Sequence, residues 1–232
     1  MSWRWLASHG SSMSPMDGNG MGAMPIEPWS ADYLGSAFLM WAIMMVAMML
    51  PSAAPMILLH ARINRAPTSG QRLVHSSLFA IAYLLVWTVF SGAAAVAQTL
   101  LVDVGIISSA SLAVGDHVIA AAILAAAALY QFSSVKVACL DHCRSPIHFI
   151  MHFGSPGIAG TLKLGLVHGL FCMGCCWALM LFLFVTGVMN LGWVAVIAAL
   201  IFIEKMAPRE WHASTVIGIV LLAGATGLIM SE

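Results

Sequence analysis

Charged side chains are scarce in this chain. Lys and Arg together number 9, Asp and Glu together also number 9, and these four types make up only 8% of the 232 residues. In soluble globular domains about a quarter of the residues are charged, so the composition excludes an ordinary soluble protein. The formal net charge is 0, which gives no electrostatic reason to bind nucleic acid.

The sequence also lacks the patterns of several kinds of enzyme. It contains no glycine-rich loop followed by lysine, of the kind that cradles nucleotide phosphates. It shows no aspartate in the setting of a phosphorylated pump and no plausible hydrolase triad. We therefore predict no catalytic residues and no ATP-driven transport by this chain alone.

Long apolar runs are abundant instead. Hydrophobic residues make up 61% of the chain, and a helix needs about 20 apolar residues to cross a bilayer. We predict an all-α, polytopic transmembrane helical bundle that forms one domain, residues 33–232. Its six expected spans are residues 34–59, 74–101, 117–138, 160–187, 190–204 and 214–230. The fourth and fifth are expected to form a helical hairpin.

The basic residues predict the orientation of these spans. Eight of them lie in the loops that follow the first, third and fifth spans: Arg62, Arg65, Arg72, Lys136, Arg144, Lys163, Lys205 and Arg209. Cytoplasmic loops are enriched in Lys and Arg. We therefore expect a multi-pass protein of a cell inner membrane with both termini on the non-cytoplasmic side.

Residues 1–32 form a different kind of segment. Their Gly, Ser and Pro content predicts a flexible arm, and the arm carries His9, Met13, Met16, Met21 and Met24. Thioethers suit Cu(I), so the arm is either an ordinary lead-in or an extracytoplasmic lure for copper. The opening residues make no complete signal peptide, and the stub of a further span is the alternative to a simple arm.

The most informative residues lie in the fourth span. On an α-helix His168, Cys172 and Cys175 fall within an arc of roughly 60°, and Cys176 widens it to about 100°. Thiolates and imidazoles select Cu(I), Zn or Fe–S by their softness, so this face predicts a metal site near the middle of the span. Two alternatives remain: thiol redox chemistry at the Cys-x-x-Cys pair, or an inert helix in which cysteine packs as a small residue.

The first span adds methionines at helical spacing. Met44 lies one turn from Met48, and Met45 one turn from Met49. Methionine is usually an apolar filler, but thioethers at the depth of the cysteines would favour Cu(I) over zinc. Pro51 and Pro55 are expected to bend this helix.

Two further groups of candidate ligands lie near the basic loops. Cys139, His142 and Cys143 follow the third span, where they are either metal ligands or reduced cytosolic thiols, because a disulfide is disfavoured on that side. Glu204 ends the fifth span. It is either a gate or ligand for a cation or half of an interfacial pair with Lys205.

These residues resemble the signatures of a family of bacterial integral membrane proteins catalogued as predicted metal-binding, DUF2182. The resemblance covers about residues 33–210 and rests on four segments. They are Met40-Trp41 through Pro55-Met56, Tyr130-Gln131 with Lys136 and Cys139-x3-Cys143-Arg144-Ser145-Pro146, His168-Gly-x2-Cys172-x-Gly-Cys175-Cys176-Trp177 with Gly187-x-Met189-Asn190, and Glu204-Lys205. It implies metal binding in a membrane and no assigned substrate.

We therefore predict a membrane protein that binds a soft metal for transport, handling or cuproenzyme assembly. Copper is the expected ion and zinc the alternative. The expected partners are the lipid bilayer and a metallochaperone or a cuproenzyme. A membrane thiol–disulfide or electron-transfer protein and a scaffold subunit of a membrane complex are the two competing interpretations.

Overall fold

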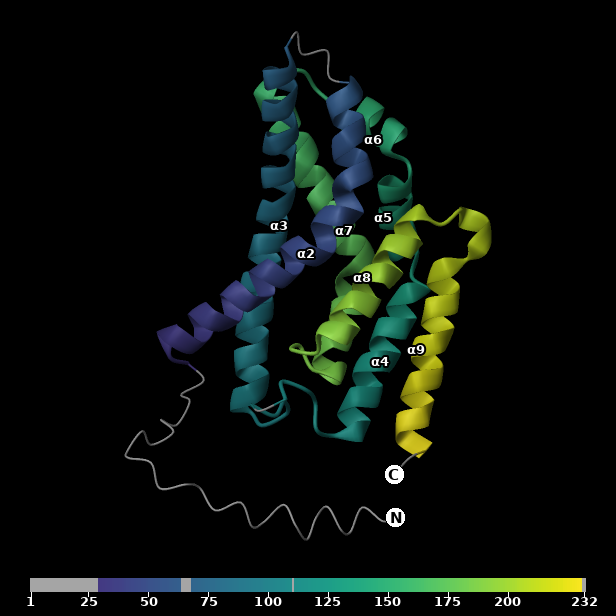
Figure 1. Ribbon diagram of the computed structural model, residues 1–232. Coiled ribbons are helices and arrows are strands. Elements are labelled where there is room, and N and C mark those ends of the chain that lie inside the picture. The colour runs from purple at the N-terminus through teal and green to yellow at the C-terminus, as the bar shows by residue number, and fades with distance from the viewer. Residues whose placement is uncertain (1–28, 64–67, 110, 231–232) are drawn as a thin grey trace.

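The computed structural model describes residues 29–63, 68–109 and 111–230, so nearly all of the expected N-terminal arm lies outside the described residues (Figure 1). The helices in chain order are α2 (Ala31–Ile63), α3 (Ser69–Asp103), α4 (His117–Gln131), α5 (Ser134–Arg144), α6 (Pro146–Phe153), α7 (Gly157–Thr186), α8 (Leu191–Met206), the short 3₁₀ helix η1 (Arg209–Trp211) and α9 (Ala213–Met230). In these ranges the only β-type pairing is an isolated bridge between Ile107 and Val114. The predicted all-helical fold is confirmed.

Four helices are long and apolar enough to cross a membrane: α2, α3, α7 and α9, with 33, 35, 30 and 18 residues. A fifth passage exists if α4 and α5 count as one span broken by a 62° bend. By length and apolarity the described residues thus offer four or five membrane passages, and the expected count of six stays a prediction. The predicted fifth span is α8, whose 16 residues fall short of the roughly 20 that a bilayer requires.

The expected third span, 117–138, is interrupted. Helix α4 ends at Gln131 and α5 begins at Ser134. The Ser133 hydroxyl accepts a hydrogen bond from the Lys136 amide at 3.2 Å, which caps the first turn of α5. A new helix therefore starts in a new direction without proline or glycine, and this turns α5 toward α7.

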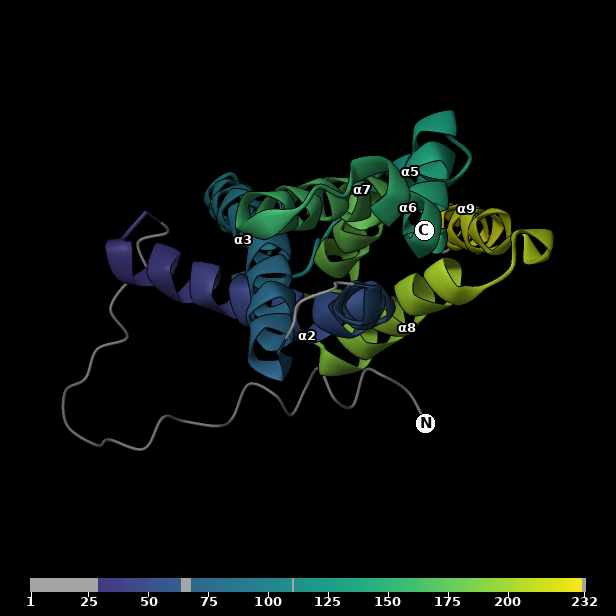
Figure 2. The same ribbon diagram turned by 90° about the horizontal axis from the view of Figure 1, so that it is seen from above.

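Helix α7 occupies the centre of the bundle. It packs against α3 on one side and against α4 and α5 on the other, while α2 packs on α3 and α8, and α9 covers α4. Figure 2, seen from above, places α7 between α3 and α5, with α2 and α8 beside this row. One face of the middle of α7 is thus buried by the surrounding helices.

Glycines let α3 and α7 approach closely. A Cβ atom at Gly165 would lie 2.5 Å from the Phe79 carbonyl oxygen, and one at Gly169 would lie 2.8 Å from Val86 Cγ2. Small residues at such positions allow close helix packing in lipid. The close approach brings Tyr83 of α3 against the cysteine-bearing part of α7.

Helix α2 contains Pro51 and Pro55 within one unbroken helical assignment. Figure 1 shows its axis change direction between an oblique first part and an upright second part. Proline removes a backbone donor and crowds the preceding turn, so the bend expected from the sequence is present.

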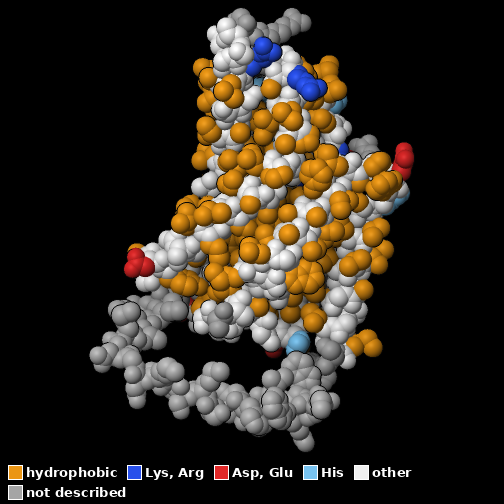
Figure 3. Space-filling view, viewed as in Figure 1, with side chains coloured by type: hydrophobic (Ala, Val, Ile, Leu, Met, Phe, Trp, Pro, Cys, Tyr) orange, Lys and Arg blue, Asp and Glu red, His pale blue; other side chains and the backbone are white. Residues whose placement is uncertain are grey.

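The surface is apolar over most of its height. In Figure 3 hydrophobic side chains cover the visible face, and the Lys and Arg side chains gather toward its upper end. Two lysines expected in the basic loops are instead inside the bundle, because Lys136 is 1% exposed and Lys205 is 4% exposed. Each has a specific buried partner, and these partners belong to the candidate site.

Candidate functional site

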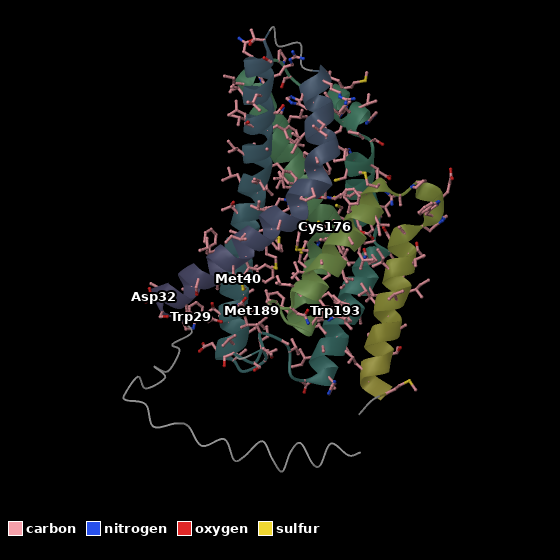
Figure 4. All side chains as sticks on the ribbon, viewed as in Figure 1. Trp29, Asp32, Met40, Cys176, Met189 and Trp193 are labelled. Atoms are coloured by element: carbon pink, nitrogen blue, oxygen red, sulfur yellow. The ribbon has the colours of Figure 1, made fainter. Side chains whose placement is uncertain are left out.

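The three cysteines of α7 are buried together. Cys172, Cys175 and Cys176 are each at most 1% exposed, and Figure 4 places Cys176 in the interior of the bundle, about midway along it. The thiols of Cys175 and Cys176 donate to the Cys172 carbonyl oxygen at 3.1 and 3.0 Å. The helix thus holds the sulfur-bearing face that its spacing predicts.

A fourth thiol reaches this cluster from α5. Cys143 Sγ lies 4.0 Å from Cys175 Sγ, and both residues are buried. All five cysteines are free. The sequence suggested two separate sulfur sites, whereas the structure brings one cysteine of the second site into the first.

The other members of the Cys-x2-His-Cys segment take different positions. Cys139 is only partly buried, and its sulfur would lie 2.7 Å from a Cβ atom at Gly174. The His142 ring stacks on Phe171 with centroids 4.3 Å apart, and its Nδ1 lies 2.8 Å from the Ala138 carbonyl oxygen. Both side chains therefore make packing contacts on α7, and their predicted metal ligation stays a prediction.

Lys205 supplies a buried positive charge next to the cluster. Its Nζ donates to Cys172 Sγ and to Ser52 Oγ, both at 2.9 Å. The Tyr83 hydroxyl lies 3.0 Å from the same sulfur and 3.2 Å from the Met49 carbonyl oxygen. The ammonium group of Lys205 therefore favours negative charge on the Cys172 sulfur, while the Tyr83 hydroxyl donates its proton to the Met49 carbonyl oxygen.

Glu204, a predicted ligand, has both oxygens engaged elsewhere. Lys136 Nζ lies 2.9 Å from Oε1 and 2.8 Å from Oε2, and both side chains are buried. Arg144 Nε donates to the Glu204 carbonyl oxygen at 2.8 Å. The acid thus joins α5 to α8 as half of an ion pair, and its partner is Lys136 rather than the Lys205 that sequence proximity suggested.

His168 lies one turn before Cys172 and is 3% exposed. Its ring contacts the rings of Phe79, Tyr83 and Phe149, with centroids 5.9, 5.6 and 5.3 Å apart. Its Nδ1 has no hydrogen-bond partner among the described residues. A buried polar atom without a partner is costly, so this nitrogen is suited to a ligand that the protein chain itself does not provide.

A cavity of about 290 Å³ connects these groups. It is lined by side chains of α2, α5, α7 and α8, among them Cys143, His168, Lys205 and Met56. Pro146, at the start of α6, also lines it. The cavity therefore joins the thiol of α5, the unpartnered imidazole and the buried ammonium group in one space.

The methionines predicted to face the cysteines are buried in the same core. Met44, Met45, Met48 and Met49 are at most 9% exposed and belong to the apolar cluster that contains Cys172, Cys175 and Cys176. The Trp41 ring of α2 contacts the Phe184 ring of α7, with centroids 5.4 Å apart. Near the cysteines, the Tyr83 hydroxyl contacts both the Met49 carbonyl oxygen and the Cys172 sulfur. Thioether ligation by these four stays a prediction.

The geometry suits an ion that needs few ligands. Within the described ranges no group of three or more His, Cys, Asp or Glu side chains is arranged to hold a metal. Metal–thiolate bonds of about 2.3 Å allow one ion to bridge two sulfurs up to about 4.6 Å apart, and the Cys143–Cys175 distance is 4.0 Å. The donor set of thiols and one imidazole fits a soft cation.

Three participants in this site were not predicted as such. Lys136 and Lys205 were counted among loop charges, and Tyr83 was not singled out. The available indication was the pair Glu204-Lys205 closing an apolar segment, since charged residues inside a bundle almost always have partners there.

Fold and site define an all-helical protein whose membrane-length helices enclose a cluster of thiols. The chain belongs to the PpoB2 family, described as copper chaperone, whose model matches residues 38–228. A copper-related role follows from this membership. The expected DUF2182 name stays a prediction. Comparison with curated proteins and with solved structures finds no match.

Proposed function

We propose that this protein spans a membrane and holds Cu(I) between α5 and α7 before passing it to a protein partner. The observation that carries the proposal is the 4.0 Å separation of Cys143 Sγ and Cys175 Sγ. His168, whose Nδ1 has no hydrogen-bond partner among the described residues, and Met56 line the cavity that also contains Cys143. Copper is the ion that the family description supports.

Charge balance favours a monovalent ion at this position. Two thiolates and one Cu(I) carry a net charge of minus one, and the ammonium group of Lys205 would neutralise it. A buried site of zero net charge avoids the large cost of an uncompensated charge in a low-dielectric interior. Zinc would add a second positive charge and asks for four ligands in a tetrahedron.

Release to a partner requires a route for a competing ligand. The cavity that contains Cys143 is bounded by Pro146 and Arg144, where α5 gives way to α6. We propose that an incoming thiol or thioether enters here and reaches Cys143 first. We propose that copper leaves by stepwise exchange of Cys143 for a donor of the partner, a metallochaperone or a cuproenzyme.

The membrane setting rests on helix length and apolarity. Four or five passages are available, and α8 would line the site without spanning the bilayer by itself. We propose the inner membrane of a bacterial cell, with the basic end on the cytoplasmic side. The methionines of the N-terminal arm and of α2 would deliver copper from the other side.

The test is Cu(I) binding by the detergent-purified protein, measured without oxygen by competition with a chromophoric Cu(I) chelator. Cys143→Ser and Cys175→Ser should each lower the affinity of the tight site at least about tenfold, a free-energy loss of about 1.4 kcal/mol. Cys139→Ser is the matched control, because it removes a partly buried thiol of the same α5 helix that packs against Gly174. Equal affinity in all four proteins would overturn the proposal.

Thiol redox chemistry is the second candidate, and one observation favours it. Lys205 adjoins Cys172 at 2.9 Å, and a neighbouring cation activates a cysteine. The sulfurs of Cys143 and Cys175 lie 4.0 Å apart, so mild oxidation should crosslink α5 to α7 through these two residues. A redox protein would need this crosslink for activity. A copper carrier should lose copper binding on forming it, which peptide mass spectrometry and the chelator assay together distinguish.

A further inference from the structure

A second, larger cavity lies toward the end of the bundle where α2 ends and α3 and α7 begin. Its volume is about 670 Å³, and two histidines line it, His60 from α2 and His75 from α3. In Figure 1 this is the upper end of the molecule, beyond the level of α8. Neither histidine takes part in the thiol cluster.

His60 has an unsatisfied nitrogen at this cavity. Its side chain is 8% exposed, and its Nδ1 has no hydrogen-bond partner among the described residues. The ring is held by stacking on Phe79, with centroids 5.4 Å apart and planes 29° apart. The cost of burying an unpaired ring nitrogen would be removed by a ligand bound in the cavity.

His75 is oriented in the manner of a metal ligand. Its Nδ1 lies 2.8 Å from Thr161 Oγ1, and the Thr161 hydroxyl donates to the Gly157 carbonyl oxygen at 3.2 Å. Since the hydroxyl proton is used, the oxygen accepts from Nδ1–H of His75. This hydrogen bond fixes the tautomer, which leaves the lone pair of Nε2 free. Metal-binding histidines are held by such second hydrogen bonds.

We propose that His60 and His75 form an imidazole site that binds Cu(I) at the basic end of the bundle and exchanges it with the thiol cluster. Imidazole binds copper well, and two imidazoles in an open cavity leave room for a donor of the molecule that exchanges copper. The choice of Cu(I) as the ion rests on the proposed function. The site itself rests on the unpartnered nitrogen of His60 and the fixed tautomer of His75.

The two sites are neighbours. Phe79 separates His60 from His168, with ring centroids at 5.4 and 5.9 Å from its own. Met56 packs in the same cluster as Phe79 and also lines the cavity that contains Cys143. A thioether at this point suits Cu(I), so Met56 is placed to accept the ion between the imidazole pair and the thiols.

The test uses the full-length protein in detergent with one equivalent of Cu(I), in a Cys143→Ser/Cys175→Ser background that disables the tight site. Copper X-ray absorption should then show imidazole scattering. Adding His60→Asn and His75→Asn should abolish Cu(I) binding at one equivalent. Changing His148→Asn and His152→Asn instead is the matched control, because these histidines form an exposed stacked pair on α6 and should leave the spectrum unchanged.

A milder variant protects the test against misfolding. Thr161→Val keeps both imidazoles and removes only the group that fixes the tautomer of His75, so affinity at the imidazole site should fall about tenfold or more. If Cu(I) binding persists after His60→Asn and His75→Asn, this inference is wrong, and the proposed thiol site is not affected. Wild-type affinity in the Cys143/Cys175 variant, with binding lost only in the histidine variant, would instead overturn the proposed function.

Discussion

The ammonium group of Lys205 lies 2.9 Å from the sulfur of Cys172, deep between α7 and α8. The acid next to it in the chain, Glu204, is not its partner, because that carboxylate is taken by Lys136. A buried lysine without a carboxylate is costly unless another group accepts its charge. The sulfur of Cys172 and the hydroxyl oxygen of Ser52 accept its hydrogen bonds, which places Lys205 to balance the charge of a thiolate in the cluster.

Replacing this lysine should weaken copper binding. Two unit charges about 4 Å apart interact by about 4 kcal/mol at an effective dielectric of about 20, so Lys205→Met should lower Cu(I) affinity at the thiol site well over tenfold. The chelator competition assay measures this. Lys163→Met is the control, since Lys163 is an exposed lysine on the same helix as Cys172. Unchanged affinity in a folded Lys205→Met protein would contradict the charge-balance argument.

The ion pair of Glu204 and Lys136 should matter for stability rather than for copper. Glu204→Gln leaves the buried ammonium group of Lys136 without a charge partner, which costs about 3–5 kcal/mol. Thermal unfolding in detergent, followed by circular dichroism, should show a clear drop in the midpoint. Glu210→Gln changes an exposed acid nearby and should leave the midpoint in place.

A double substitution separates this role from ligation. Lys136→Met with Glu204→Leu removes both charges, and such replacements of buried pairs are often neutral or stabilising. The double variant should therefore recover most of the lost stability and bind Cu(I) normally. If it folds but no longer binds, then Glu204 is a ligand, as its position at the end of an apolar segment suggested.

Most of the fold could be predicted, because apolar length decides it. The four membrane-length helices coincide with predicted spans, and the prolines of α2 predicted its bend. The break between α4 and α5 depends on one capping serine, Ser133, in a segment without proline or glycine. Serine also occurs within apolar helices, so Ser133 alone did not predict a break in the span.

Only the part of the candidate site that lies on a single helix could be predicted from the sequence. Helical spacing places His168, Cys172 and Cys175 together because they share α7. Cys143 approaches Cys175 because the bend before α5 sets the direction of that helix. No local sequence pattern predicts this direction. The partner choice of Lys205 and Lys136 is likewise a tertiary outcome, since adjacent residues on a helix point in different directions.

Close packing of α3 on α7 offers a last test, because it positions Tyr83 and His168 at the site. A Cβ atom at Gly165 would meet the Phe79 carbonyl oxygen at 2.5 Å and the Ala82 Cβ at 2.9 Å. Backbone cannot yield cheaply, so Gly165→Ala should force the helices apart at a cost of about 1–3 kcal/mol. Both the unfolding midpoint and the Cu(I) affinity should fall.

The control for this prediction is Gly92→Ala on α3. Nothing lies within 4 Å of a Cβ atom there, and alanine is the better helix former by up to about 1 kcal/mol, so stability should hold or rise. Because Phe79 also stacks on His60, displacement at Gly165 should disturb the imidazole site as well as the thiol cluster. The prediction is wrong if the Gly165→Ala protein is as stable as the Gly92→Ala protein and binds Cu(I) as tightly. In that case the close α3–α7 contact is not what positions Tyr83 and His168.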